Sequence, residues 1–554
     1  MTASPKTESI SRIAFNMSIK PDKQEERGTP ETPKQASSSG LMGSVSVVSG
    51  ATAFSRVLGL IRVQLLARYF GASMAADAFF VAYRIPNLFR DLFAEGSLST
   101  AFIPVFKKTL VSDGKARAQQ LSDRMFTLLF LALSSTVVLG ILAAGGLVFL
   151  MAGGFASEPE KFELTVTLTR WLFPYLLFVS LSALLMGILN SYGKFGVPAF
   201  ASSMFNIAMI LAMVFLYEAF DVHVYCLIVG VLVGGIGQFG IQIPALYRAG
   251  GRLRFDFKFR DPGIKSVGKL MAPMIIGLSA SRVNIFVATL LASMQGDGAV
   301  SYLVYAYQLM HFPQGVFAVA IGTVALPRAS ELVAKGDIER LAGTLRSATR
   351  MALYLIIPSA IYLALFNEDL INAIYLRGAF TAHDASEVSL ALFWYSLGLP
   401  ALSGVRVFTP IFYAFSDSRT PMRYSVIAVV ANIVLALLLV ESPWVHMGFA
   451  GLAAATSIAG WLNIALLIIG LRKRQVFTQV GSYLESILKT MLAAGAMALA
   501  LYVQPFDLSF GFAGVIGKGL SLTLTVFGGA LVYWFASLAL GLSEGRRVLN
   551  MIRK

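Results

Sequence analysis

The chain has 554 residues, of which 56% are hydrophobic and 14% are charged, and its mean hydropathy is +0.71. Soluble domains typically contain about 25% charged residues, so this composition excludes a soluble protein and predicts a polytopic, all-α membrane protein. The net charge of +15 would indicate a nucleic-acid partner only if the positions of the basic residues were unrelated to those of the apolar segments.

Residues 1–43 are rich in Ser, Thr, Pro, Lys and Glu and have no hydrophobic periodicity, which predicts a disordered tail. The first apolar run after them is longer than a signal-peptide core, so we expect it to remain as a helix. The runs long enough to span a membrane predict fourteen helices, at approximately 44–66, 77–104, 125–152, 164–189, 197–217, 223–247, 267–292, 299–326, 351–374, 386–413, 422–441, 446–470, 484–504 and 514–541.

The connections between these runs alternate in charge. Counted from the N-terminus, the even connections are basic, as in Lys107 and Lys108 or Arg472, Lys473 and Arg474, whereas the odd ones are often acidic, as in 158–163. By the positive-inside rule, this alternation places both termini in the cytoplasm. The basic charge therefore reflects topology, and we expect no nucleic-acid partner.

The two halves of the chain are related by an internal repeat. Ser55-Arg56 recurs as Ser281-Arg282 and Ala82-Tyr83 as Ala306-Tyr307. Each unit holds six predicted helices, an even number, so the units share one orientation, as in transporters whose substrate lies between two lobes. The predicted organisation is a tail at 1–43, an N-lobe at 44–250, a C-lobe at 251–475, helices 13 and 14 at 476–541, and a cytoplasmic tail at 542–554.

The second predicted helix is unusually polar. Arg84, Asn87, Asp91 and Glu95 follow helical spacing and form one narrow stripe, with Arg90 about 100° away. Pro86 within this helix removes a backbone hydrogen bond and predicts a kink.

Further arginines lie in helices 1 and 7, at Arg56, Arg62 and Arg282. Such residues are costly in lipid, so we expect them to line a wet cavity between the lobes. The alternative is that Asp91 and Glu95 only neutralise neighbouring arginines as structural ion pairs. A cavity dominated by arginine favours an anion, and the guanidinium fork suits phosphate oxygens.

The segment SRVLGLIRVQLLARYFGASMAADAFFVAYRIPNLFRDLFAEGSLSTAFIP resembles the N-terminal signature of the MurJ (MviN) lipid II flippase family, within the multidrug/oligosaccharidyl-lipid/polysaccharide exporter superfamily. The segments YAYQLMHFPQGVFAVAIGTVALP and FYAFSDSRTP are also similar to that family, so the resemblance covers roughly residues 44–541.

The resemblance implies a transporter that moves lipid II, the polyprenyl-pyrophosphate-linked peptidoglycan precursor, across the bacterial cytoplasmic (inner) membrane. It also implies that helices 13 and 14 form a groove for the polyprenyl tail. It implies no cofactor and a monomer, with cell-wall synthesis or division proteins as possible partners. The positions that carry over are Arg56, Arg62, Asp77, Asn87, Arg90 and Glu95, with Arg406 as a basic position in helix 10.

Two departures from the family pattern stand out. Many relatives have an arginine where this chain has Gln308, and Arg282 is the candidate to supply the missing cation. Some relatives bind sodium through carboxylates in helices 7 and 11, where this chain offers Asn284 and Asn432, so no sodium site is carried over.

Two other classes of function remain to be compared. A cation-coupled drug or polysaccharide-lipid exporter of the same superfamily would use a buried carboxylate, for which Asp77 or Glu95 is the candidate, but the excess of arginine argues against it. A membrane glycosyltransferase would need paired carboxylates in large loops, which are missing. With four histidines and one cysteine, Cys226, the sequence offers no metal or ATP site, and we expect no enzyme.

Overall fold

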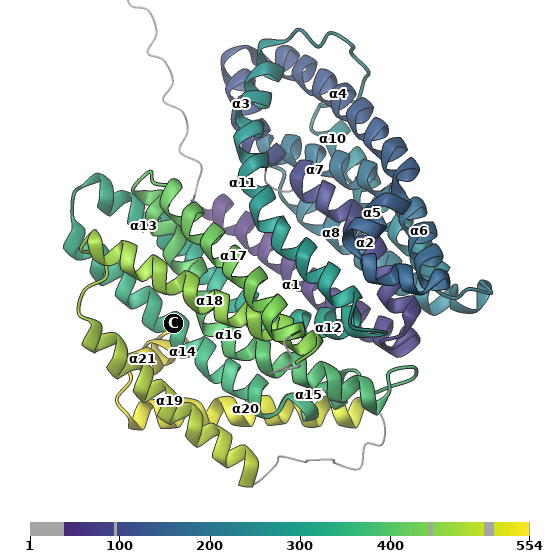
Figure 1. Ribbon diagram of the computed structural model, residues 1–554. Helices are drawn as coiled ribbons and strands as arrows, with labels where there is room; N and C mark the ends of the chain where they lie inside the picture. The colour runs from purple at the N-terminus through teal and green to yellow at the C-terminus, as the bar shows by residue number, and fades with distance from the viewer. Residues whose placement is uncertain (1–37, 94–96, 442–446, 504–514, 553–554) are drawn as a thin grey trace, which may run out of the picture. The chain divides into compact units, whose positions relative to one another are not determined.

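The computed structural model describes residues 38–93, 97–441, 447–503 and 515–552. The chain divides into a short N-terminal unit that ends at Ser46 and a second unit, Val47–Lys554, which holds every contact and cavity discussed below. The tail predicted at 1–43 lies outside the described residues up to residue 37, and the first helix begins at Ser38. Every regular element among the described residues is helical, as Figure 1 shows.

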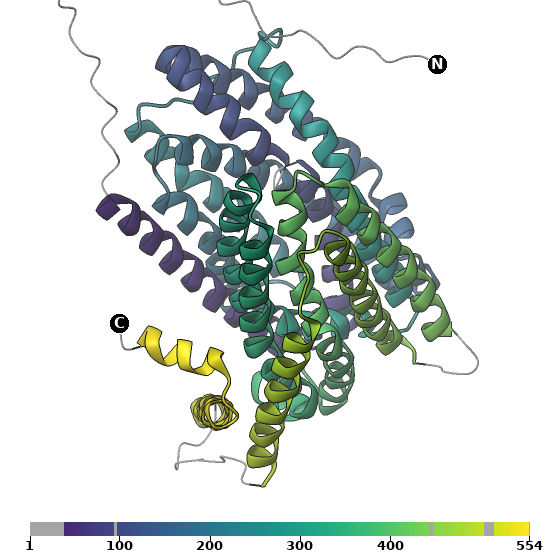
Figure 2. The same cartoon turned by 90° about the vertical axis from the view of Figure 1, so that its left-hand side faces the viewer.

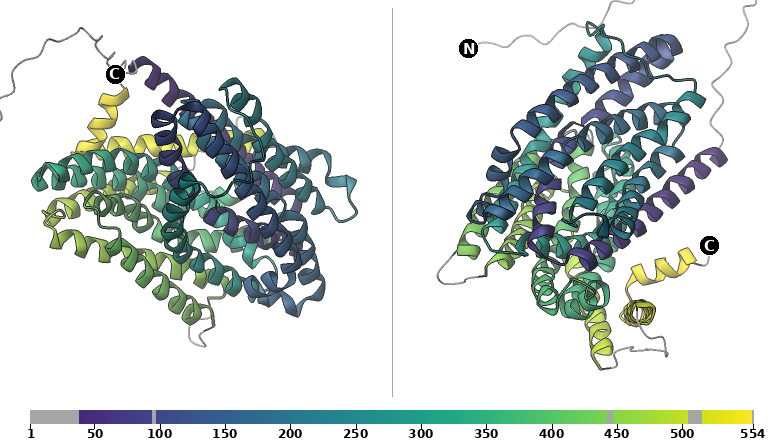
Figure 3. Two further views of the ribbon diagram at one scale, coloured as in Figure 1. Left: turned by 90° about the horizontal axis from the view of Figure 1, so that it is seen from above. Right: turned by 90° about the vertical axis from the view of Figure 1, so that its right-hand side faces the viewer.

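The described residues of the first half of the chain form ten α-helices and two short 3-10 turns, and we call these the N-terminal helices. They are coloured purple to blue-green in Figure 3. Their bounds are α1 Ser38–Phe70, α2 Met74–Phe93, α3 Ser97–Ser112, α4 Gly114–Leu142, α5 Ala144–Met151, η1 Gly153–Ser157, α6 Pro159–Leu172, α7 Tyr175–Ser191, α8 Gly196–Phe215, η2 Tyr217–Ala219, α9 Tyr225–Gly240 and α10 Gln242–Arg248.

The second half, in the part that the structure describes, forms eleven α-helices and one π-helical turn, and we call these the C-terminal helices. Their bounds are α11 Pro262–Ser293, α12 Ala299–Pro313, η3 Gln314–Ala318, α13 Val319–Ala334, α14 Ile338–Leu365, α15 Asn367–Ile374, α16 Ala382–Ala414, α17 Arg419–Glu441, α18 Phe449–Lys473, α19 Val480–Val503, α20 Val515–Ala539 and α21 Ser543–Ile552.

Among the described residues, ten helical segments are long and apolar enough to cross a membrane. They correspond to predicted helices 3 to 6 and 9 to 14, so the prediction of an all-α, multi-pass membrane protein is confirmed. The other four predicted spans lie in α1, in α2 with α3, in α11, and in α12 with α13. These are the helices that carry the candidate site, and the count of fourteen stays a prediction.

An asparagine at equivalent positions in the repeat bonds to the first helix of its own half of the chain. Asn206 of α8 donates a hydrogen bond to the Ser55 carbonyl of α1 at 3.1 Å. Asn432 of α17, its counterpart in the sequence repeat, donates to the Asn284 side chain of α11. In each half, the fifth predicted helix is therefore bonded to the first by a buried asparagine, which supports the repeat.

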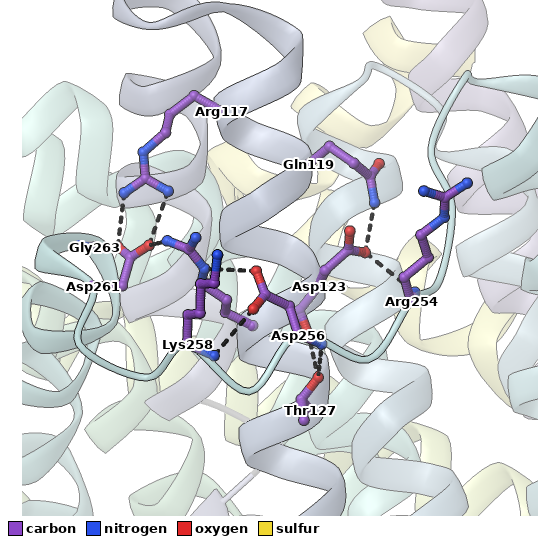
Figure 4. A network of polar contacts seen from close by, with 10 residues as sticks. Arg117, Gln119, Asp123, Thr127, Arg254, Asp256, Lys258, Asp261 and Gly263 are labelled. Carbon is purple, nitrogen blue, oxygen red and sulfur yellow. Dashed lines mark hydrogen bonds and ion pairs between the residues drawn. The ribbon is translucent and has the colours of Figure 1, made fainter.

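The extended segment 249–261, which joins α10 to α11, is fixed to α4 by ion pairs (Figure 4). Asp261 precedes α11 and accepts a hydrogen bond from the Gly263 N–H at 2.7 Å, so it caps that helix. Its carboxylate also contacts Arg117 at 2.8 Å and Arg124 at 2.5 Å. Burial alone would raise the pKa of the Asp261 carboxyl, but hydrogen bonds from the two arginines lower it to about 2.

The same segment makes further contacts along α4. Arg124 also pairs with Asp256 at 2.8 Å, and the Asp256 N–H donates to the Thr127 hydroxyl. The Asp123 side chain accepts hydrogen bonds from Gln119 and from the Arg254 N–H. The basic connection at the start of the C-terminal helices is therefore an ordered strap on the N-terminal helices.

Helices α19 and α21 pack against α14, and α20 packs against α19 and α21. In Figure 2 these last three helices are the yellow-green and yellow ones. Arg350 of α14 pairs with the buried Glu544 of α21 at 2.8 Å, and the Tyr354 hydroxyl lies 2.9 Å from the Ser537 hydroxyl of α20. Helices 13 and 14 of the prediction, α19 and α20, are thereby joined to the C-terminal helices through α14.

Candidate functional site

A cavity of about 420 Å³ lies between N-terminal helices α1, α2 and α8 and C-terminal helices α11, α12, α16 and α18. Four arginines and a single carboxylate line it among its ionisable residues, so its interior carries a net positive charge. The polar residues that line it include Arg62, Arg84, Asn87, Arg90, Asp91, Arg282 and Gln308.

Asp91 lies between two of these arginines. Its carboxylate is 3.1 Å from the Arg90 guanidinium and 2.9 Å from that of Arg282. The contact between Asp91 and Arg282 joins α2 to α11, so it links the two halves of the chain. The alternative that Asp91 neutralises neighbouring arginines therefore describes its geometry correctly.

The other two cavity arginines pair with no carboxylate among the described residues. Arg84 donates to the Thr289 hydroxyl of α11 at 2.6 Å. Arg62 packs over the Phe205 ring, 5.2 Å from its centroid, and its buried Nε has no hydrogen-bond partner in the described part of the chain. The Asn87 side-chain oxygen is likewise buried without a partner there. Because no carboxylate among the described residues neutralises Arg62 or Arg84, the cavity can receive an anionic ligand.

A second cavity, of about 750 Å³, adjoins the first and shares Arg62 and Gln308 with it. Arg56 and His311 line it on the same side as the shared residues. Its other walls are largely apolar side chains of α14, α15, α19 and α20. The two cavities together therefore run from a cluster of arginines to the helices for which the sequence predicts a lipid-tail groove.

The predicted site residues do not all meet in one cavity. Arg56 lines only the second cavity and Arg282 only the first. Arg406 is exposed and lines neither, but its charge acts on Tyr307 and His311 beside them. Glu95 lies outside the described residues.

An amide pair lies at the two positions to which no sodium site was carried over. Asn284 and Asn432 bond to each other. No group of three potential metal-ligating side chains occurs in the part of the chain that the structure describes.

Asp77 is fully buried at the end of the helices that carries the odd-numbered connections, here called the odd end. It belongs to α2, but it caps α12: its carboxylate accepts hydrogen bonds from the Gly298 N–H at 2.8 Å, the Ser301 N–H at 2.9 Å and the Ser301 hydroxyl at 2.6 Å. A negative charge at a helix N-terminus is favourable, because the unpaired N–H groups point toward it. The two halves of the chain are thus closed against each other here.

Lys161 of α6 completes this cluster, and sequence reasoning missed it. Its ammonium group is fully buried, 3.2 Å from Asp77 and 2.5 Å from Asp297, and it lies 4.3 Å from the Phe155 ring centroid. The signal was available in the sequence, because Lys161 is a basic residue in an odd connection that is otherwise acidic.

Backbone contacts close the odd end at a second place. The Ala379 N–H donates to the Arg68 carbonyl, and the Tyr305 hydroxyl donates to the Gly71 carbonyl, each at 2.8 Å. At Gly378, whose φ is +62°, an added Cβ would lie 2.3 Å from the Arg68 carbonyl oxygen. Only glycine allows the two halves to approach so closely.

Buried charges between two groups of membrane helices, with one end closed by contacts between them, define the chain as a multi-pass membrane protein of a transporter type. The family model for lipid II flippase MurJ matches residues 66–515. Among curated proteins, the lipid II flippase MurJ of Burkholderia cenocepacia is 36% identical over 91% of this chain and 96% of its own length. A probable lipid II flippase MurJ of Vibrio cholerae is 34% identical over 90% and 96%. The chain belongs to the lipid II flippase MurJ family.

Solved structures agree with this assignment. A lipid II flippase MurJ in an inward closed conformation superposes with a TM-score of 0.72 and 27% identity, covering 88% of this chain and 97% of the other. An inward-facing multidrug resistance transporter of the MATE family superposes with a TM-score of 0.60 at 13% identity, covering 78% of this chain and 97% of its own. That second likeness concerns the fold alone.

Proposed function

We propose that this protein is a lipid II flippase, which moves the polyprenyl-pyrophosphate-linked precursor of peptidoglycan from the inner to the outer leaflet of the bacterial cytoplasmic membrane. The observation that carries the proposal is the pair of adjoining cavities, one with four arginines against one carboxylate and one with apolar walls. The substrate has the matching parts, an anionic pyrophosphate and a long hydrocarbon tail.

In this proposal Arg62 lies at the centre of the site, because it lines both cavities and its Nε is buried without a partner among the described residues. Arg84 and Arg56 flank it on either side, and a guanidinium can donate two hydrogen bonds to phosphate oxygens. The tail would follow α14 toward α20, along Leu355 and Val526.

Transport requires the site to face each side of the membrane in turn, so the contacts at the odd end have to separate. We infer that the lobes predicted at 44–250 and 251–475 move against each other. Asp77 of one lobe would then release Ser301 of the other, while the opposite end, which carries the even-numbered connections, closes. Following the positive-inside rule, the odd end is periplasmic, and both chain termini are cytoplasmic. No covalent step is needed, so the protein acts as a transporter and not as an enzyme.

A complementation experiment tests the proposal. A strain depleted of its own lipid II flippase should grow and keep its shape when it expresses this protein, and should lyse when it expresses Arg62→Gln at the same membrane abundance. Lysis with the inserted wild-type protein would contradict the proposal and favour an exporter of the same superfamily with another cargo.

A further inference from the structure

An apolar groove of about 380 Å³ lies outside the two cavities of the site, on the opposite face of α14. Its walls come from α14, α16, α18 and α19, and we call it the α14–α19 groove. Exposed side chains at its rim, among them Leu397, Trp461 and Met491, show that it opens at the surface of the helices. The lining is apolar almost throughout, so we expect the groove to open toward lipid and not toward water.

Two hydroxyls in this apolar lining have no hydrogen-bond partner in the described part of the chain. Thr349 is 6% exposed and Ser403 is 2% exposed, and neither donates to its own helix. By contrast, the hydroxyl of Ser396, which lines the same groove, donates to a carbonyl of its own helix, that of Phe393, at 2.7 Å. Buried polar atoms are almost always paired, so these two hydroxyls are exceptions within the helix packing beside the groove.

A cation lies at the same end of the groove. Arg346 precedes Thr349 by three residues on α14, so the two side chains share a helix face. Its guanidinium lies near the hydroxyl of Tyr483, which lines the groove from α19. Arg346 forms no ion pair with the described residues, so no carboxylate among them neutralises its charge.

The length of the groove fits an acyl chain. α14 lines it from Thr349 to Ala364, a rise of about 22 Å at 1.5 Å per residue. The hydrocarbon of one leaflet is about 15 Å thick, so the groove is longer than one leaflet is deep. Phe477 stacks on Tyr483 with ring centroids 4.4 Å apart and closes the groove at the end near Arg346.

We propose that the α14–α19 groove is a binding site for one anionic phospholipid, with an acyl chain against α14 and its phosphate at Arg346. Arg346 lies at the end of the helices that carries the basic, even-numbered connections. The anionic headgroups of the cytoplasmic leaflet attract such basic residues, so we place the bound lipid in that leaflet. This site is separate from the proposed substrate path and does not depend on the identity of the substrate.

Native mass spectrometry of the full-length protein in detergent tests the proposal, with phosphatidylglycerol and phosphatidylcholine of identical chains as probes. The wild-type protein should retain one phosphatidylglycerol at least fivefold more strongly than phosphatidylcholine. Arg346→Gln should remove that preference, and Arg346→Lys should restore part of it. Arg472→Gln, which changes an exposed arginine on α18 that does not line the groove, should behave as the wild type.

A second pair of variants separates the groove from general attraction to the basic surface. Ala360→Phe and Ser403→Leu fill the groove from α14 and α16, so each should reduce retention of both phospholipids, at an unchanged elution profile. The proposal would be overturned if Arg346→Gln retained phosphatidylglycerol as strongly as the wild type. It would also be overturned if both filling variants did so. Displacement of phosphatidylglycerol from the wild-type protein by undecaprenyl phosphate would also overturn it, because the groove would then belong to the polyprenyl path.

Discussion

Asp77 caps a helix in the other half of the chain, where its carboxylate receives hydrogen bonds from both the N–H and the hydroxyl of Ser301. The pair is fully buried, and Lys161 lies against it. A carboxylate at the N-terminus of α12 stabilises the closed odd end through charge as well as hydrogen bonds. The same contact has to be broken for the cavity to open on that side.

Removing the charge of Asp77 should cost more than removing the Ser301 hydroxyl. Asp77→Asn leaves Lys161 buried with Asp297 as its remaining carboxylate, and breaking a buried ion pair typically costs about 3–5 kcal/mol. Ser301→Ala removes one of three hydrogen bonds to the carboxylate and should cost about 1 kcal/mol. Thermal unfolding of the purified variants measures the difference, and equal midpoints would contradict the assigned role.

The contact between Arg282 and Asp91 permits a test of what Arg282 does. If Arg282 only neutralises Asp91, the double variant Arg282→Gln with Asp91→Asn should restore transport that Arg282→Gln alone reduces. If Arg282 binds the substrate, the double variant should stay at least tenfold below wild type, whereas Arg282→Gln with Gln308→Arg should recover. Since Asp91 contacts both Arg90 and Arg282, the geometry favours the first result.

The strap on α4 should make stability depend on acid. The pKa of Asp261 is about 2 in the folded protein, below about 3.9 for an unfolded aspartate, so its contribution is complete above pH 4 and is lost as the pH falls toward 2. Asp261→Asn should therefore reduce the free energy of unfolding at pH 7 by about 2 kcal/mol and lower the unfolding temperature. Between pH 4 and pH 2, the unfolding temperature of the variant should decrease less than that of the wild type. Asp256→Asn, which removes a more exposed partner of Arg124, is the control and should have the smaller effect.

Thiol labelling can establish the sidedness. Cys226 is fully buried, so Cys226→Ser provides a background without a native thiol. In spheroplasts, an impermeant maleimide should label Asp221→Cys, in an odd connection, and should label Lys258→Cys, in an even one, only after lysis. The opposite pattern would place the termini outside the cytoplasm.

Helices, repeat and family could be predicted from the sequence because they depend on local patterns. Apolar length and loop charge predicted the multi-pass fold, and the recurrence of Ser55-Arg56 predicted two related halves whose asparagines make matching contacts. The four other predicted spans fall outside the apolar criterion for different reasons. α2 carries four charged residues, whereas the span 299–326 has none but is divided between α12 and α13 at η3.

The partners of the predicted site residues could not be obtained in the same way. Asp77 was expected to be a gating or structural charge, but nothing local indicates that the carboxylate reaches the start of α12, more than two hundred residues later. The pairing of Asp91 with Arg282 likewise depends on how α2 packs against α11. Sequence spacing gives the face on which a residue lies, and tertiary packing decides what that face meets.

Exposure of lipid II on the outer leaflet is the measurement that tests the central claim most directly. In cells depleted of their own flippase, the wild-type protein and Arg472→Gln should restore access of an externally added lipid II-cleaving toxin to its substrate. Arg62→Gln should reduce that access at least tenfold at equal membrane abundance, and Arg62→Lys should recover only part of it, because a lysine keeps the charge but loses the bidentate fork. Full access with Arg62→Gln, or none with the wild-type protein, would contradict the account.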